Sequence, residues 1–284
     1  MTVARLGSFS AAAVELGYTQ AAVSQQIAAL ESDLKVVLLS RRPVAPTETG
    51  ARLLEHAEPI LLRLDAARAD VTRMTQAPAA TLMVGATPLA GGSTALPGAL
   101  AALRRQMPRL DVTVRIGTRR HVATGVARGD LDIGLLDGLA APGDPLPEFA
   151  PLTSMGLSQV GVAVVLPVGH PLAARRSLRL TDLADARWIE APDVAPPLSE
   201  IRRLAGVEGF RPAFHYDGTD TMSLIGLAAA AHGITLLPET VLPGTGITAI
   251  AVTAPRVVHR VELVHGTLRN GSPAAELAAL LSPR

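Results

Sequence analysis

Apolar side chains recur at helical spacing through the first 76 residues, with no strand-like alternation. Near the start of the chain, Ala12, Ala13 and Leu16 fall on one helical face. Ser8 is a favourable N-cap residue, and Gly17 is typical of the position just after a helix end. The pattern therefore predicts a short helix between Ser8 and Gly17.

A second helix follows after one tight turn. Thr19 is a suitable N-cap, and Val23, Ile27 and Leu30 share a face at spacings of four and three residues. The small alanines of the first helix allow the second to cross it closely, as a helix-turn-helix requires. The same spacing also fits an ordinary helical hairpin, which is the commoner arrangement.

A third helical pattern begins at Glu48 and continues for more than six turns, with apolar residues every three or four positions. Proline disrupts the interior of a helix, so Pro59 predicts a break near Ala57 and a separate helix from Pro59 to Met74. A long helix with one apolar stripe needs a partner, most simply the same helix of a second copy. The alternative is that the stripe packs on the downstream domain of its own chain.

From residue 80 onward, short Val/Ile/Leu runs alternate with helical stretches. The change in composition at residues 76–80 predicts a linker there. Strands are expected at 81–86, 111–116, 131–136, 159–166, 188–190, 213–216, 234–237 and 257–264, and helices at 93–107, 122–128, 180–184, 199–205, 222–232 and 273–281. The first set reads as βαβαβ, half of a doubly wound sheet, and the second set resembles it. Two such halves predict two lobes with a ligand cleft at the carboxyl ends of the strands.

The chain has 284 residues, a formal net charge of +1 and no cysteine. This length favours at least two compact units. Disulfides, cysteine zinc sites and thiol nucleophiles are excluded, and near-neutrality disfavours a protein coated in positive charge for binding polyanions. The longest apolar run, residues 224–238, spans 15 positions and contains His232, so no membrane span is expected. Without a secretion-type leader, the expected location is the cytoplasm.

Several segments together resemble the winged helix-turn-helix of LysR-type transcriptional regulators: residues 7–13, 16–27, 29–31 and 47–50, which read GSFSAAA, LGYTQAAVSQQI, ALE and TETG. The resemblance extends over essentially the whole chain, including the helix-glycine-strand segment at 223–239. It implies an α/β protein with a winged helix-turn-helix at 1–58, a dimerising linker helix at 59–78 and a two-lobed, Rossmann-like effector domain at 79–284, similar to periplasmic binding proteins. Lobe I would comprise about 79–155 and 246–284, and lobe II about 156–245.

Three features depart from the family pattern. About ten residues that usually precede the equivalent of Gly7 have no counterpart here, which suggests a late start or a shortened copy. The wing is short, with two prolines and few basic residues between Arg41 and Thr47. Lys35 stands where a glycine usually follows the recognition helix.

The resemblance assigns DNA contacts to the second helix and the wing. Residues implied to reach bases or phosphates are Thr19, Gln20, Ser24, Gln25 and Gln26 on the helix and Arg41 and Arg42 in the wing. A Gln/Ser face without this context is more often only solvated. Residues 1–76 hold eight Lys/Arg and eight Asp/Glu, a net charge of zero. DNA affinity must then depend on a few placed cations, helix dipoles and a dimer, with a shallow salt dependence.

Strand ends and helix starts facing the cleft supply the candidate effector contacts. These are Thr87, Pro88, Ser93, Thr94, Thr118 and Asp137 in lobe I, and Pro192, Thr219 and Thr221 in lobe II. Taken singly, each is more typical of turn and cap chemistry, and only convergence on one crevice supports a site. A small anionic or polar metabolite fits them best, with lobe closure changing the arrangement of the dimer or tetramer on promoter DNA.

Two other classes of protein compete with a regulator. An enzyme is disfavoured because the seven histidines form no HExxH or HxxxH motif, and neither GxSxG nor a full dinucleotide fingerprint occurs. His259 and His265 share a face of one expected strand, which a surface strand explains equally well. A stand-alone solute-binding protein would need a secretion signal and would not need residues 1–76. No cofactor or metal site is expected.

Overall fold

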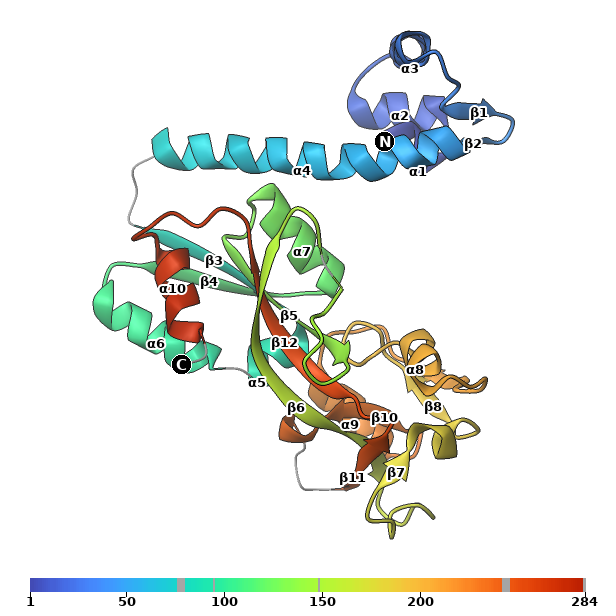
Figure 1. Cartoon of the computed structure of the whole chain (residues 1–284), viewed down its shortest axis with the longest axis vertical. Helices are drawn as coiled ribbons and strands as arrows, with labels where there is room; N and C mark the ends of the chain where they lie inside the picture. Colours follow the sequence, from blue (N-terminus) through green and yellow to red (C-terminus); the bar gives the residue numbers. More distant parts are fainter. Residues whose placement is uncertain (76–79, 94, 148, 242–245, 283–284) are drawn as a thin grey trace. The chain divides into compact units, whose positions relative to one another are not determined.

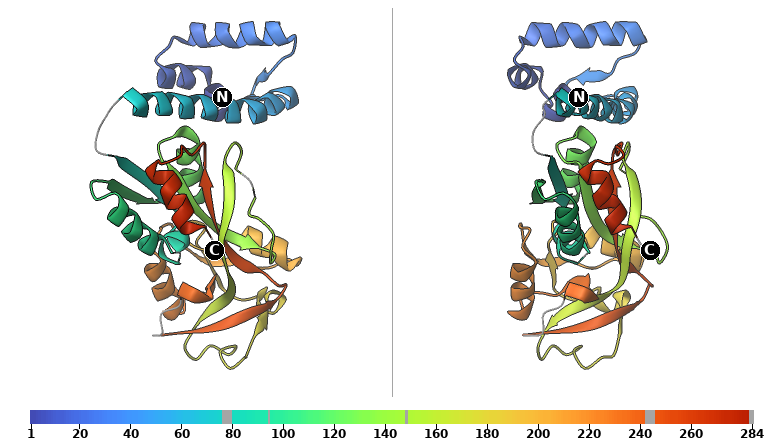
Figure 2. Two further views of the ribbon diagram at one scale, coloured as in Figure 1. Left: turned by 60° about the vertical axis from the view of Figure 1, so that its left-hand side comes forward. Right: turned by 90° about the vertical axis from the view of Figure 1, so that its left-hand side faces the viewer.

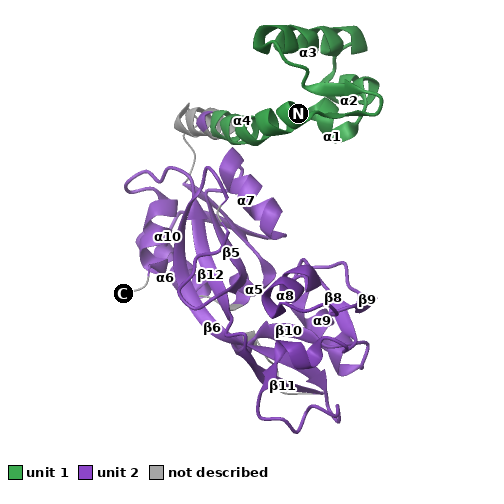
Figure 3. Cartoon of the chain, turned by 45° about the vertical axis from the view of Figure 1, so that its right-hand side comes forward, with its two compact units in different colours: residues 1–64 green, residues 65–284 purple. Residues whose placement is uncertain are grey.

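The computed structural model describes residues 1–75, 80–93, 95–147, 149–241 and 246–282. The chain divides into two compact units, Met1–Leu64 and Asp65–Arg284, coloured separately in Figure 3. The linker predicted at residues 76–80 falls almost wholly outside the described residues.

Unit 1 is a helical domain with a small wing (Figure 1). Its elements are α1 (Thr2–Leu6), α2 (Phe9–Leu16), α3 (Gln20–Leu34), the hairpin β1 (Leu39–Arg41) and β2 (Val44–Pro46), and the first part of α4 (Glu48–Thr75). The caps are those predicted: the Ser8 hydroxyl accepts the Ala11 amide, and Gly17 ends α2 in the left-handed conformation. Ala12 and Ala13 are buried, so α3 can lie close to α2.

The helix α4 corrects one expectation. Pro59 lies inside a single helix of 28 residues, so the predicted break near Ala57 is wrong. A proline removes only one backbone donor, so the hydrogen bonds on either side of Pro59 continue the helix. Part of that stripe is uncovered, because Ile60, Leu61 and Leu64 are 66%, 45% and 46% exposed.

Unit 2 is built on one long, mixed sheet with the strand order β4-β3-β5-β12-β6-β11-β7, and β10 also pairs with β6. The strands are β3 (Thr81–Ala86), β4 (Asp111–Ile116), β5 (Ile133–Ala140), β6 (Thr153–Pro167), β7 (Leu178–Arg179), β8 (Trp188–Glu190), β9 (Pro212–His215), β10 (Thr235–Pro238), β11 (Ile247–Ala254) and β12 (Val258–His265). The helices are α5 (Pro88–Ser93), α6 (Leu96–Gln106), α7 (Arg119–Arg128), α8 (Leu198–Ala205), α9 (Thr221–Ala229) and α10 (Pro273–Leu281), with short 3-10 turns η1 (Leu180–Leu183) and η2 (Glu239–Val241).

Two lobes share this sheet (Figure 2). In lobe I, α6 and α10 pack together against β3, while α7 covers β5 and β12 from the other face. In lobe II, α8 and α9 pack with β8, β10 and β11 around Trp188, Phe210 and Leu236. The strand β6 links the lobes, because its first half pairs with β12 and its second half with β10 and β11.

Most expected elements of unit 2 are present, with three differences. The helix predicted at 93–107 is divided into α5 and α6. The strands β7 and β11 were not predicted, and β6 is about twice its expected length. Ile250 and Val252 of β11 belong to the lobe II core, so the chain returns to lobe I at β12 rather than at residue 246.

Candidate functional sites

The exposed face of α3 is a candidate nucleic-acid interface. Its N-terminus is capped by Thr19, whose hydroxyl accepts the Ala22 amide at 3.2 Å. Gln25 and Gln26 are exposed and Ser24 is half-buried, while Val23 on the opposite side packs into the unit 1 core. The helix therefore presents its polar side outward and its amide dipole toward Thr19.

Gln20 is held in place by the neighbouring helix. The Ser10 hydroxyl of α2 donates to Gln20 Oε1 at 3.0 Å. Because this bond occupies the amide oxygen, the two N–H donors of the Gln20 side chain are directed away from α2. The Gln20 side chain is thus oriented by α2.

The wing arginines differ in their surroundings. The Arg41 guanidinium lies 5.1 Å from the Phe9 ring centroid and 3.8 Å from Glu31 Oε2, yet its side chain remains 58% exposed. Glu31 Oε1 also accepts the Leu38 and Leu39 amides at 2.8 and 3.1 Å. Arg41 therefore joins α2, α3 and β1, whereas Arg42 is exposed at the hairpin turn.

The turn after α3 has Lys35 at a position where glycine is usual. This residue has φ = 54°, the left-handed conformation that normally favours glycine, and the Val36 amide closes the helix end by donating to the Glu31 carbonyl at 3.1 Å. The backbone path is thus an ordinary left-handed cap despite the side chain.

In lobe I, the predicted effector residues Thr87, Thr118 and Asp137 lie on or just after neighbouring strands β3, β4 and β5. The Thr87 hydroxyl donates to Asp137 Oδ1, and Asp137 Oδ2 lies 2.8 Å from His259 Nε2 on β12. Thr87 is 5% exposed and His259 only 1%. The surface-strand explanation for His259 is therefore wrong, since it is a buried partner of Asp137.

Thr118 and its neighbour Arg119 begin α7. The Thr118 hydroxyl accepts the His121 amide at 3.1 Å, which makes it the N-cap. Burial lowers the pKa of Arg119, while the charges of Glu200, Asp137 and Glu262 raise it in compensation. Burial also raises the pKa of Glu200 on α8, opposed chiefly by Arg119. Arg119 and Glu200 therefore interact electrostatically from lobe I to lobe II.

The candidate effector residues of lobe II also follow a strand or begin a helix. Pro192 follows β8 and is exposed, and Thr219 and Thr221 flank Asp220 at the start of α9. Asp220 accepts the Ser223 and Met222 amides at 2.8 and 3.4 Å, and hydrogen bonds from Ser223 are the main reason that its pKa is lowered. This helix N-terminus already holds its own carboxylate.

The loop expected to precede the helix at residue 93 is arranged differently. Gly91, Gly92 and Ser93 belong to α5, which begins at Pro88, and the next helix begins at Leu96. Ser93 is thus a last helical residue rather than a cap, and Thr94 lies outside the described residues.

Residue-by-residue inspection of the sequence missed Arg119, Glu200, Glu262 and Phe149. One signal for Arg119 was present: α7 begins Arg119-Arg120-His121 with no acidic residue in its first turn, which is the unfavourable end of the helix dipole for cations. Within the described ranges, no cluster of three or more metal-ligating side chains occurs. Across those same ranges, no helix is long and apolar enough to cross a membrane.

Residues 1–51 match the family described as "Bacterial regulatory helix-turn-helix protein, lysR family", and residues 75–280 match "LysR substrate binding domain". The chain belongs to the LysR family of transcriptional regulators. Relatives include the transcriptional dual regulator GltC of Bacillus subtilis, 27% identical over 89% of this chain and 84% of GltC. The uncharacterized HTH-type transcriptional regulator YnfL of Escherichia coli is 32% identical over 81% of this chain and 76% of YnfL.

Solved structures of the LysR fold agree with this assignment. Full-length CbnR in complex with its target DNA superposes with a TM-score of 0.57 at 21% identity, covering 99% of this chain and 95% of that one. The effector-binding domain of BenM with benzoate gives 0.56 at 17% identity over 72% of this chain and 91% of that one. This LysR-type regulator thus has the predicted helix-turn-helix and two-lobed α/β domain, and the family is one of regulators rather than enzymes.

Proposed function

We propose that this LysR-type regulator reads promoter DNA through the N-terminal half of α3. The observation that carries the proposal is the capped α3, with Gln25 and Gln26 exposed and Gln20 oriented by Ser10. Glutamine amides of this kind can pair with adenine edges in the major groove, and the amide ends near Thr19 can bind a backbone phosphate. Arg42, and the exposed edge of Arg41, would contact phosphates beside the groove.

In this proposal, a second copy of the chain pairs with the first to form the DNA-binding unit. The uncovered Ile60, Leu61 and Leu64 of α4 would pair with the same stripe of another protomer. Two recognition helices would then meet half-sites about one helical turn apart, or at a multiple of that distance. Because residues 1–76 carry no net charge, this duplication supplies affinity that the charge does not.

The effector domain is proposed to bind a small polar or anionic metabolite in the cleft between its lobes, in the cytoplasm. Thr87, Thr118 and Asp137 would face it from lobe I, and Pro192, Thr219 and Thr221 from lobe II. Since Asp220 already occupies the N-terminus of α9, an acidic group of the metabolite fits better against Thr118 in lobe I.

A gel-shift titration of the purified full chain on its own upstream DNA tests the DNA proposal. Gln25→Ala should weaken binding by about 5- to 150-fold, because one base contact is worth about 1–3 kcal/mol. Ser32→Ala, an exposed change two turns along the same helix, should bind like the parent. Equal binding by Gln25→Ala and the parent, with both chains folded, overturns the assignment of α3.

A further inference from the structure

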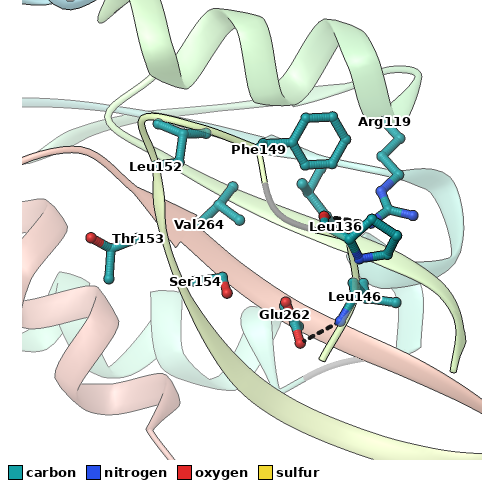
Figure 4. Close-up of a pocket in the computed structure, with 10 residues that line it drawn as sticks. Arg119, Leu136, Leu146, Phe149, Leu152, Thr153, Ser154, Glu262 and Val264 are labelled. Atoms are coloured by element: carbon teal, nitrogen blue, oxygen red, sulfur yellow. Dashed lines mark hydrogen bonds between the residues drawn. The ribbon is translucent and has the colours of Figure 1, made fainter. Parts of the chain in front are cut away.

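A cavity of about 270 Å³ lies in lobe I, between the sheet and the segment that joins β5 to β6 (Figure 4). Six of its ten lining residues are apolar: Leu136, Leu146, Pro147, Phe149, Leu152 and Val264. Thr153, Ser154, Glu262 and Arg119 provide its polar groups. The volume corresponds to about nine water-sized atoms, which is the size of a compact organic acid rather than of a nucleotide.

The cavity and the interlobe cleft lie on opposite faces of the sheet. Leu136 lines the cavity, whereas Asp137, the next residue of β5, bonds Thr87 and His259. Successive side chains of a strand point to opposite faces. The face of Leu136 is the one that α7 covers, with Val122 and Val126. A ligand in the cavity would therefore be separate from one in the cleft.

Arg119 lies at the edge of the cavity with part of its hydrogen-bonding capacity unused. Its guanidinium lies 5.1 Å from the Phe149 ring centroid, and one terminal nitrogen donates to the Pro147 carbonyl at a long 3.5 Å. Its Nε is buried and, among the described residues, has no hydrogen-bond partner. A cation whose hydrogen-bonding capacity is this poorly used is costly to bury, so a ligand oxygen at its terminal nitrogens would be favoured.

Glu262, the acidic group of the cavity, is already neutralised. Its Oε1 accepts Arg260 Nε at 2.6 Å and the Leu146 amide at 3.1 Å, and the residue is 3% exposed. The negative charge of Glu262 is thus paired with Arg260 rather than with Arg119. Arg119 and the basic first turn of α7 therefore provide the positive charge beside the cavity.

We propose that this cavity is a second ligand site, which binds a small apolar carboxylic acid. The carboxylate would accept from the terminal nitrogens of Arg119, and Thr153 and Ser154 would donate to it. The hydrocarbon part would lie against Phe149, Leu152 and Val264.

The test is calorimetric titration of the full chain with cyclohexanecarboxylate, using the uncharged cyclohexanecarboxamide as its counterpart. A charge-assisted bond is worth about 1.5–3 kcal/mol, so the acid should bind roughly 10- to 100-fold more tightly than the amide. Arg119→Met keeps an apolar stem without the charge, and should reduce acid binding to the level of the amide. Ser154→Leu fills the cavity and should abolish binding of both.

Arg120→Met is the matched control, because Arg120 has the same charge at the same helix end but does not line the cavity. It should bind the acid within about twofold of the parent, since an exposed charge one residue away contributes little. Fluorescence of Trp188, buried in lobe II, checks that each variant is folded. If Arg119→Met does not fold, Ser154→Leu decides. Equal binding of acid and amide, or acid binding unaffected by Ser154→Leu, overturns the proposal, and neither result depends on DNA binding.

Discussion

The contact between Gly50 and Leu38 gives the sharpest test of how unit 1 is assembled. Gly50 lies in the first turn of α4, and a Cβ added there would come within 2.0 Å of the Leu38 carbonyl oxygen. The same carbonyl accepts the Thr47 amide at 2.9 Å, and the Gly50 amide donates to the Thr47 hydroxyl at 3.0 Å. The start of α4 is thus held by hydrogen bonds against Leu38, the residue that precedes β1.

Gly50→Ala should therefore destabilise unit 1 severely. A carbon-to-oxygen contact needs about 3.3 Å, so the Leu38 carbonyl must retreat by about 1.3 Å. Overpacking of this kind costs about 1–3 kcal/mol, and the hydrogen bonds that the retreat strains add about 1 kcal/mol. The expected loss in free energy of unfolding is about 2–4 kcal/mol, confined to unit 1.

Gly98→Ala is the matched control, because Gly98 is also helical but has nothing within 4 Å of an added Cβ. Replacing a helical glycine by alanine without a clash should stabilise α6 by up to about 1 kcal/mol. Amide hydrogen exchange in α2 and α3 reports on unit 1, and the urea transition of Trp188 fluorescence reports on unit 2. If Gly50→Ala leaves exchange in unit 1 within 0.5 kcal/mol (about a factor of two) of the parent, the reasoning is refuted.

Three further changes test other parts of the molecule. Thr19→Ala removes the α3 cap and should speed exchange of the Ala22 amide by about fivefold, equivalent to about 1 kcal/mol, while Ser8→Ala should affect Ala11 instead. Asp137→Ala leaves the buried Thr87 and His259 without their acceptor, and should lower the free energy of unfolding by about 2–4 kcal/mol in urea titrations; a loss under 1 kcal/mol contradicts the network. Burial raises the pKa of Glu200 in the folded state above the ordinary glutamate value of about 4.3. As the pH rises from below about 4.3 through the raised pKa, the parent should therefore lose free energy of unfolding relative to Glu200→Gln. Parallel pH profiles of stability for the two chains would argue against this burial effect.

Local features followed directly from the sequence. Ser8 and Thr19 cap their helices as their positions suggest, because a cap depends only on residues two or three places away. The spacing of Val23 and Ile27 likewise placed one face of α3 toward the core. The same short-range information supported the family resemblance, and with it the LysR assignment.

Tertiary structure decided the features that join distant residues. Asp137 and His259 lie 122 residues apart, so no local pattern showed that the histidine is buried beside that carboxylate. The cavity at Arg119 depends on α7, the β5–β6 connection and β12 meeting at one place. The helix α4 also continues through Pro59, although proline disfavours a helix interior. One missing hydrogen bond is outweighed by the many hydrogen bonds that the helix forms on either side of Pro59. Sequence determines local conformation, but long-range packing determines which polar groups end up together without water.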